Sequence, residues 1–126
     1  MQSTERVRHR MLTRNTYRFF RSGGAFQQTI DNLDITKSYR IVYYYVKFDT
    51  PSPSGACSIV TTIGGQQIGS IVLTAPRTPN NQFEQSISTT FQPSTSLLSL
   101  SIGIACISTS STRYYIDDVS IEEVTI

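Results

Sequence analysis

The sequence predicts an all-β protein, an antiparallel β-sandwich or jelly roll, and three observations support this fold class. Of the 126 residues, 17 are Ser and 16 are Thr, while only 16% are charged. Because Thr fits a pleated strand and Ser suits turns, this composition favours strands over long helices. Seven segments read as strands, and turn-forming residues separate them roughly every ten residues. The length fits a single domain.

The first two predicted strands cover residues 25–30 and 37–48. The shorter one ends at the turn-forming pair Asp31-Asn32, and the longer one alternates two apolar faces. One face carries Tyr39, Ile41, Tyr43 and Tyr45, and the other carries Arg40, Val42, Tyr44 and Val46. We therefore expect a central strand that is covered on both sides or borders a groove.

The next two predicted strands form a hairpin. Residues 57–63 alternate Cys57, Ile59, Thr61 and Ile63 with smaller polar residues and Val60. Gly64-Gly65 then predicts a tight turn into the strand 66–73.

Three further strands are predicted over residues 83–91, 98–107 and 113–126. The first is expected to place Phe83, Gln85, Ile87, Thr89 and Phe91 on one face. The second alternates most regularly, with Leu98, Leu100, Ile102, Ile104 and Cys106 opposite Ser99, Ser101, Gly103 and Ala105. The third surrounds Ile116 to Ile121.

Residues 1–22 are distinct from the rest and form a basic arm, with the sandwich expected over residues 23–126. Six of the eleven basic residues lie in this arm against one acid, which gives it a charge of +5, and the remaining chain has −3. Such an arm is either disordered or atypical, or it tethers nucleic acid as some viral shells do. Residues 16–20 could instead supply an edge strand.

Several function classes are disfavoured. No stretch reaches the ~18 apolar residues of a membrane helix, and with one His and no CxxC pair a zinc site is not expected. His9 lies in the arm, so a catalytic Ser or Cys would have no His base in the domain. Adjacent carboxylates on a strand point to opposite faces, so Asp117-Asp118 and Glu122-Glu123 do not converge on a substrate. We expect a protein without catalytic activity.

Cys57 and Cys106 both lie on apolar strand faces. They are either a disulfide, which would close a loop of about 50 residues and stabilise the fold by about 4 kcal/mol, or two buried thiols. We favour the disulfide, which implies an oxidising, extracellular compartment. Because no apolar secretory signal follows the basic N-terminal residues, this location predicts that residues 1–22 are not the native N-terminus.

Two further features suggest binding. The small face of Ser99 and Ser101 suits a shallow groove, and Arg40, Tyr44 and Glu84 could line it, since an aromatic ring stacks on sugars and charged groups bond hydroxyls. The alternative is an ordinary solvated face. Asp117-Asp118 is either a calcium site at the sandwich edge, since calcium takes carboxylate oxygens, or a solvated pair beside a bulge.

Short motifs from Phe26 to Ile121 resemble carbohydrate-binding modules of the CenC type, which have a galactose-binding-like jelly roll. They are Phe26-Gln27-Gln28-Thr29-Ile30, Ser38-Tyr39-Arg40-Ile41-Val42-Tyr43, Cys57 to Ile63 with Gly64-Gly65, Phe91-Gln92-Pro93-Ser94, and Ile116-Asp117-Asp118-Val119-Ser120-Ile121. The resemblance is greatest to the Ser- and Thr-rich versions of secreted fungal proteins. It covers about three-quarters of the chain, and the family's first strands and its Trp have no counterpart before Ala25.

This resemblance implies a non-catalytic module that binds cell-wall polysaccharide of the β-glucan or xylan type, often beside a hydrolase domain in a longer parent protein. It also implies a structural calcium, for which Asp117 and Asp118 match the family's closing pair. The predicted ligand-binding residues are Arg40, Tyr44, Glu84, Ser99 and Ser101. Two alternatives stay open: a structural or adhesive sandwich with no sugar site, and a viral-shell-like jelly roll whose arm binds nucleic acid.

Overall fold

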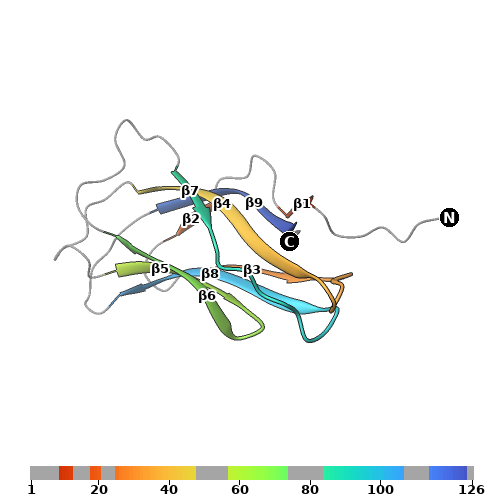
Figure 1. Ribbon diagram of the computed structural model, residues 1–126. Helices are drawn as coiled ribbons and strands as arrows, with labels where there is room; N and C mark the ends of the chain where they lie inside the picture. Colours follow the sequence, from red (N-terminus) through yellow and green to blue (C-terminus); the bar gives the residue numbers. More distant parts are fainter. Residues whose placement is uncertain are drawn as a thin grey trace.

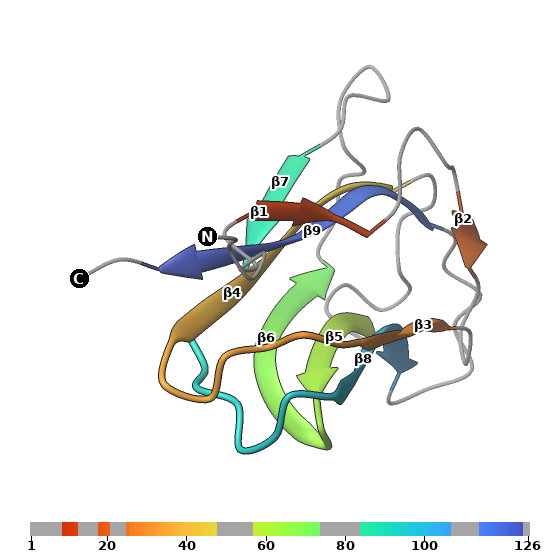
Figure 2. The ribbon, with the colours of Figure 1, turned by 90° about the vertical axis from the view of Figure 1, so that its right-hand side faces the viewer.

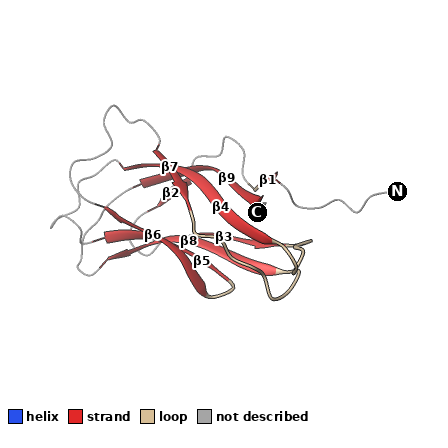
Figure 3. Ribbon diagram, viewed as in Figure 1, coloured by secondary structure: helices blue, strands red, loops and turns tan. Residues whose placement is uncertain are grey.

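The computed structural model describes residues 9–12, 18–20, 25–47, 57–73, 84–106 and 114–124, which form two antiparallel sheets packed face to face (Figures 1 and 3). Sheet A has β1 (His9–Met11) and β2 (Arg18–Phe20) beside β9 (Tyr114–Val124), followed by β4 (Ser38–Lys47) and β7 (Glu84–Ile87). Sheet B has the order β3 (Ala25–Ile30), β8 (Leu98–Cys106), β5 (Cys57–Ile63) and β6 (Gln66–Leu73). The described part of the chain contains no helix that could span a bilayer.

The strand pairs are nested along the chain. Strand β2 pairs with β9, β3 with β8, β4 with β7 and β5 with β6, always antiparallel. A long hairpin that is rolled up so that its arms alternate between two layers has this order, which is that of a jelly roll. The predicted fold class is therefore confirmed, and the edge strand considered for residues 16–20 is present over Arg18–Phe20 as β2, which pairs with β9.

The core lies between the two sheets and is made by the alternating faces that the sequence predicted. Odd-numbered residues of β4 and β5 and even-numbered residues of β8 point inward. The buried set includes Tyr39, Ile41, Tyr43, Tyr45, Cys57, Ile59, Ile63, Leu100, Ile102, Ile104, Ile116, Val119 and Ile121. Each large side chain of this kind contributes about 1.5–3 kcal/mol when it leaves water.

The β5–β6 hairpin has the predicted two-residue turn. Ile63 pairs with Gln66 across it, and Gly64 and Gly65 have φ of 57° and 85°. Both values are in the left-handed region that a type I′ turn requires at its two central residues. Glycine is therefore needed here for backbone reasons.

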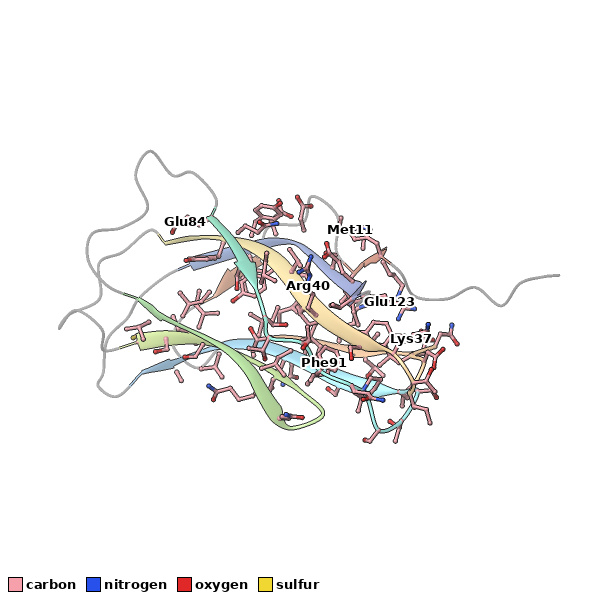
Figure 4. All side chains as sticks on the ribbon, in the orientation of Figure 1. Met11, Lys37, Arg40, Glu84, Phe91 and Glu123 are labelled. Carbon is pink, nitrogen blue, oxygen red and sulfur yellow. The ribbon has the colours of Figure 1, made fainter. Side chains whose placement is uncertain are left out.

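The predicted strand 83–91 is only partly correct, because its ladder is interrupted after Ile87. Ile87 is 50% exposed, whereas Phe91 is buried (Figure 4), so the two do not share a face. The chain leaves β4 after Ser88, and the N–H and Oγ of Thr89 each donate to the Ile68 carbonyl of sheet B at 2.9 Å. It then returns to sheet A, where Phe91 exchanges two 2.8 Å hydrogen bonds with Tyr39. The segment thus joins the two layers at one side.

The basic arm contributes strands to sheet A. Strand β1 pairs with residues 120–122 of β9 and β2 with residues 114–116, so both lie along the same edge (Figure 2). Arg10 of β1 reaches the β3–β4 loop, where its Nη1 lies 3.0 Å from Asp31 Oδ1 and its Nη2 donates to the Asp31 carbonyl. Within the described residues, the arm is therefore part of the sandwich.

Candidate binding face on sheet A

The face of sheet A that points away from sheet B, called here the outer face of sheet A, carries the even-numbered residues of β4. Arg40 lies opposite Glu122, Val42 opposite Ser120, and Tyr44 opposite Asp117. On the other side of β4, β7 places Ile87 opposite Val42 and Gln85 opposite Tyr44. Three neighbouring strands therefore present one continuous surface.

Arg40 and Glu122 form an ion pair on this face. The Arg40 Nε and Nη2 atoms both lie 2.9 Å from Glu122 Oε1. The side chains are 41% and 28% exposed, so the pair contributes at most about 1 kcal/mol to stability. Its main effect is to hold the guanidinium in a fixed plane while its remaining N–H groups stay able to donate.

Tyr44 lies on the same face of β4, beyond Val42. Its hydroxyl accepts a 3.1 Å hydrogen bond from Gln85 Nε2, and its side chain is only partly buried. Val42, Ser120 and Asp117 are buried nearby, so the accessible surface is formed by the taller side chains around them. The outer face of sheet A therefore carries an aromatic ring bonded to an amide, and further along β4 an ion pair.

The pair Asp117-Asp118 forms a β-bulge. The register with β4 shifts between Val42 and Tyr44, so that two β9 residues, Asp118 and Val119, stand opposite Tyr43. Asp118 has φ +52°, and its N–H donates to Asp117 Oδ1 at 2.8 Å. Asp is one of the few residues that adopt the left-handed conformation readily, so the bulge accounts for both acids.

Calcium at this pair stays a prediction. The described residues include no cluster of three or more His, Cys, Asp or Glu side chains suited to a metal. Two adjacent aspartates alone fall short of the six to eight oxygens that calcium takes.

Glu84 does not join this face. It stands opposite Tyr45 on the side of β7 that points toward sheet B, and Figure 4 shows it far from Arg40 along the molecule. Burial of the Tyr45 side chain is the main cause that raises its pKa to about 12, and the nearby Glu84 carboxylate adds to this effect.

Ser99 and Ser101 lie on the other layer. Leu100 and Ile102 of β8 point into the core, so the two serines face away from sheet A, on the outer face of sheet B. The structure therefore brings Arg40 and Tyr44 together and places Ser99 and Ser101 on the opposite side of the sandwich. The five predicted ligand-binding residues do not line one groove.

Two residues of the face were not singled out from the sequence. Glu122 and Gln85 become neighbours of Arg40 and Tyr44 only through the pairing of β4 with β9 and β7. Strand periodicity gives the face on which each residue lies, whereas these neighbours depend on strand order, which periodicity does not reveal.

Cys57 and Cys106 lie directly opposite each other on β5 and β8. They belong to neighbouring strands of one sheet, and Cys57 is fully buried. The pair lies where β5 begins and β8 ends, in sheet B and away from the outer face of sheet A.

Comparison with known proteins gives information on the fold. No family model and no curated protein matches the sequence. The chain is similar to a solved structure described as dimeric latent PorU from Porphyromonas gingivalis, with a TM-score of 0.66 and 12% identity over 90% of this chain. The match covers only 12% of that longer chain. At this identity, the likeness concerns the architecture alone.

Proposed function

We propose that this chain is a non-catalytic carbohydrate-binding module that recognises polysaccharide of the β-glucan or xylan type through the outer face of sheet A. The observation that carries the proposal is that the half-buried Tyr44 ring, with the Gln85 amide bonded to its hydroxyl, lies on the same face of sheet A as the Arg40–Glu122 ion pair. An aromatic surface with planar polar groups next to it suits a ring that has one apolar face and equatorial hydroxyls. The resemblance to CenC-type modules supports the same conclusion.

The structure changes which residues the proposal uses. Arg40 and Tyr44 stay in the site, Glu122 and Gln85 are added, and Glu84, Ser99 and Ser101 are left out because they lie elsewhere. Arg40 and Glu122 cancel in charge, which fits an uncharged glycan better than an acidic one.

We also propose that Cys57 and Cys106 form a disulfide and that the protein is secreted. Directly opposite residues of antiparallel strands have Cα atoms about 4.5–5.5 Å apart, within the range that a disulfide spans. Non-reducing peptide mapping should recover the two cysteine peptides linked, and two alkylated thiols in protein from its native compartment would contradict this.

Calorimetric titration with soluble β-glucan and xylan oligosaccharides tests the sugar proposal. Tyr44→Ala should weaken binding at least about tenfold, or 1.4 kcal/mol, because the stacking surface is lost. Ser101→Ala on the opposite layer is the matched control and should leave the affinity unchanged. No saturable binding to any of these glycans by folded protein would contradict the proposal and favour a structural or adhesive role.

The alternative of a nucleic-acid tether receives less support. Arg10 of the arm is already paired with Asp31, and both described segments of the arm are strands of sheet A. Binding to nucleic acid that falls steeply with salt would favour this alternative.

A further inference from the structure

Charge is divided unevenly between the two sheets. All four strands of sheet B lack Asp, Glu, Lys, Arg and His. Every strand of sheet A carries at least one such residue. Charged side chains are one of the main devices by which sheet proteins prevent their edges from pairing with other chains.

The edge strands of the described sheets differ in this protection. At the edges of sheet A, β1 contains His9 and Arg10, β2 contains Arg18, and β7 contains Glu84. At one edge of sheet B, β6 has a register shift next to Ile68, whose carbonyl accepts both Thr89 hydrogen bonds. At the other edge, β3 has neither a charge, a proline nor a bulge, and its six residues pair with β8 in unbroken register.

We propose that β3 pairs antiparallel with β3 of a second copy of this chain, about a two-fold axis through Gln28. Phe26 then lies opposite the partner's Ile30 on the inner face, and Gln27 opposite the partner's Thr29 on the outer face. This register keeps core-facing residues opposite core-facing residues, as a continuous sheet requires. It also joins an aromatic to a β-branched residue, a favourable cross-strand pair.

A second copy fits this edge better than a glycan does. The outer face of sheet B near β3 presents Gln27, Thr29, Ser99 and Ser101, and it offers no aromatic ring for stacking. The sequence of β3 is self-complementary in the proposed register, and no like charges meet. The other edge of sheet B is not available for pairing, because β6 has a bulge at Ile68 and the Ile68 carbonyl is bonded to Thr89. Pairing through β3 alone therefore gives a closed dimer and not a filament.

The two-fold axis would stand perpendicular to sheet B, so both copies would present the outer face of sheet A to the same side. This consequence rests on the proposed function: a dimer could then engage one polysaccharide surface with two sites and gain avidity. The dimer itself can be tested without any sugar.

Sedimentation equilibrium over a concentration series up to about 1 mM measures the dimer directly. The double variant Gln27→Lys, Thr29→Lys places lysine opposite lysine and should weaken dimerisation at least about tenfold. The variant Gln27→Glu, Thr29→Glu should behave in the same way. An equimolar mixture of the two should restore a heterodimer, since opposite charges then face each other.

The control variant Ser58→Lys, Thr62→Lys adds the same charge to the centre of sheet B and should keep the dimer. Circular dichroism melts establish that each variant is folded. A wild-type protein that is monomeric throughout the series overturns the proposal. A dimer that is lost in the control variant but kept in the β3 variants also overturns it, because it assigns contact to the face and not to the edge.

Discussion

Asp118 is held in a conformation that few side chains tolerate. Its φ of +52° costs an ordinary L-residue roughly 1–2 kcal/mol, and Asp117 offsets part of this by accepting the Asp118 N–H. The acidic pair thus stabilises the backbone conformation of the β9 bulge.

The bulge yields a prediction about two substitutions at one position. Asp118→Gly should leave the free energy of unfolding nearly unchanged, because glycine adopts positive φ without strain. Asp118→Ala should lower it by about 1 kcal/mol. Urea unfolding compares the two variants, and equal losses would contradict the backbone explanation.

The same measurement with added calcium tests the predicted calcium site at Asp117 and Asp118. A calcium-dependent rise in the stability of the wild-type protein would support that site.

Tyr45 makes stability depend on alkaline pH. A tyrosine in an unfolded chain ionises near pH 10, whereas burial and Glu84 raise the pKa of Tyr45 to about 12 in the fold. The folded state keeps its proton longer, so this contribution is complete below pH 10 and is lost as the pH rises through 12. Burial also raises the pKa values of Tyr39 and Tyr43, which adds to the same loss.

Tyr45→Phe should therefore flatten the decline in stability between pH 10 and 12. The effect is confined to this interval, because below pH 10 the folded and unfolded states both hold the proton. Denaturant unfolding at several pH values measures the slope. A variant whose stability falls as steeply as that of the wild type would show that other groups control the alkaline limit.

At the scale of elements, the segment after β7 connects the two layers through Thr89. Thr89→Val removes the hydroxyl hydrogen bond to the Ile68 carbonyl but retains the side-chain shape, so unfolding free energy should fall by about 0.5–1.5 kcal/mol. Thr90→Val, at the neighbouring exposed position, is the control and should have a smaller effect. Thermal unfolding distinguishes them, and equal melting temperatures would contradict the role given to Thr89.

The strands themselves were largely predictable, because period-two alternation directly reflects which side chains are buried. The structure confirms the apolar inward faces of β5 and β8, the central position of β4 in its sheet and the Gly64-Gly65 turn. The prediction that Ile87 shares a face with Phe91 was wrong, because Ser88 interrupts the ladder between them. The Ser88 Oγ atom accepts a hydrogen bond from the Ile41 N–H. The alternation of apolar and polar residues does not reveal where a side chain takes the place of a backbone group in the ladder.

The candidate site was predictable only in part for a related reason. Alternation correctly placed Arg40 and Tyr44 on one face of β4, but grouping them with Ser99 and Ser101 required knowing which layer each strand joins. The nested order puts β4 and β8 in different sheets. Glu122 could be added only once β9 was known to pair with β4.

At the scale of the whole molecule, the proposed disulfide makes stability depend on redox state. Reduction, or the double variant Cys57→Ala, Cys106→Ala, should lower the free energy of unfolding by about 2–4 kcal/mol. Urea unfolding with and without reductant measures this. The alanine variant should not respond to reductant. A wild-type protein that is equally stable in both conditions would contradict the disulfide.

The position of β9 has a consequence for how the molecule is made. This last strand is also the middle of sheet A, between β4 and the two arm strands, whereas the strands of sheet B all lie within residues 25–106. During synthesis, the strands of sheet B therefore have their full set of partners while one edge of β4 still lacks β9. Nascent chains stalled before residue 114 should leave that edge of β4 unpaired, and they are the species on which chaperones would act.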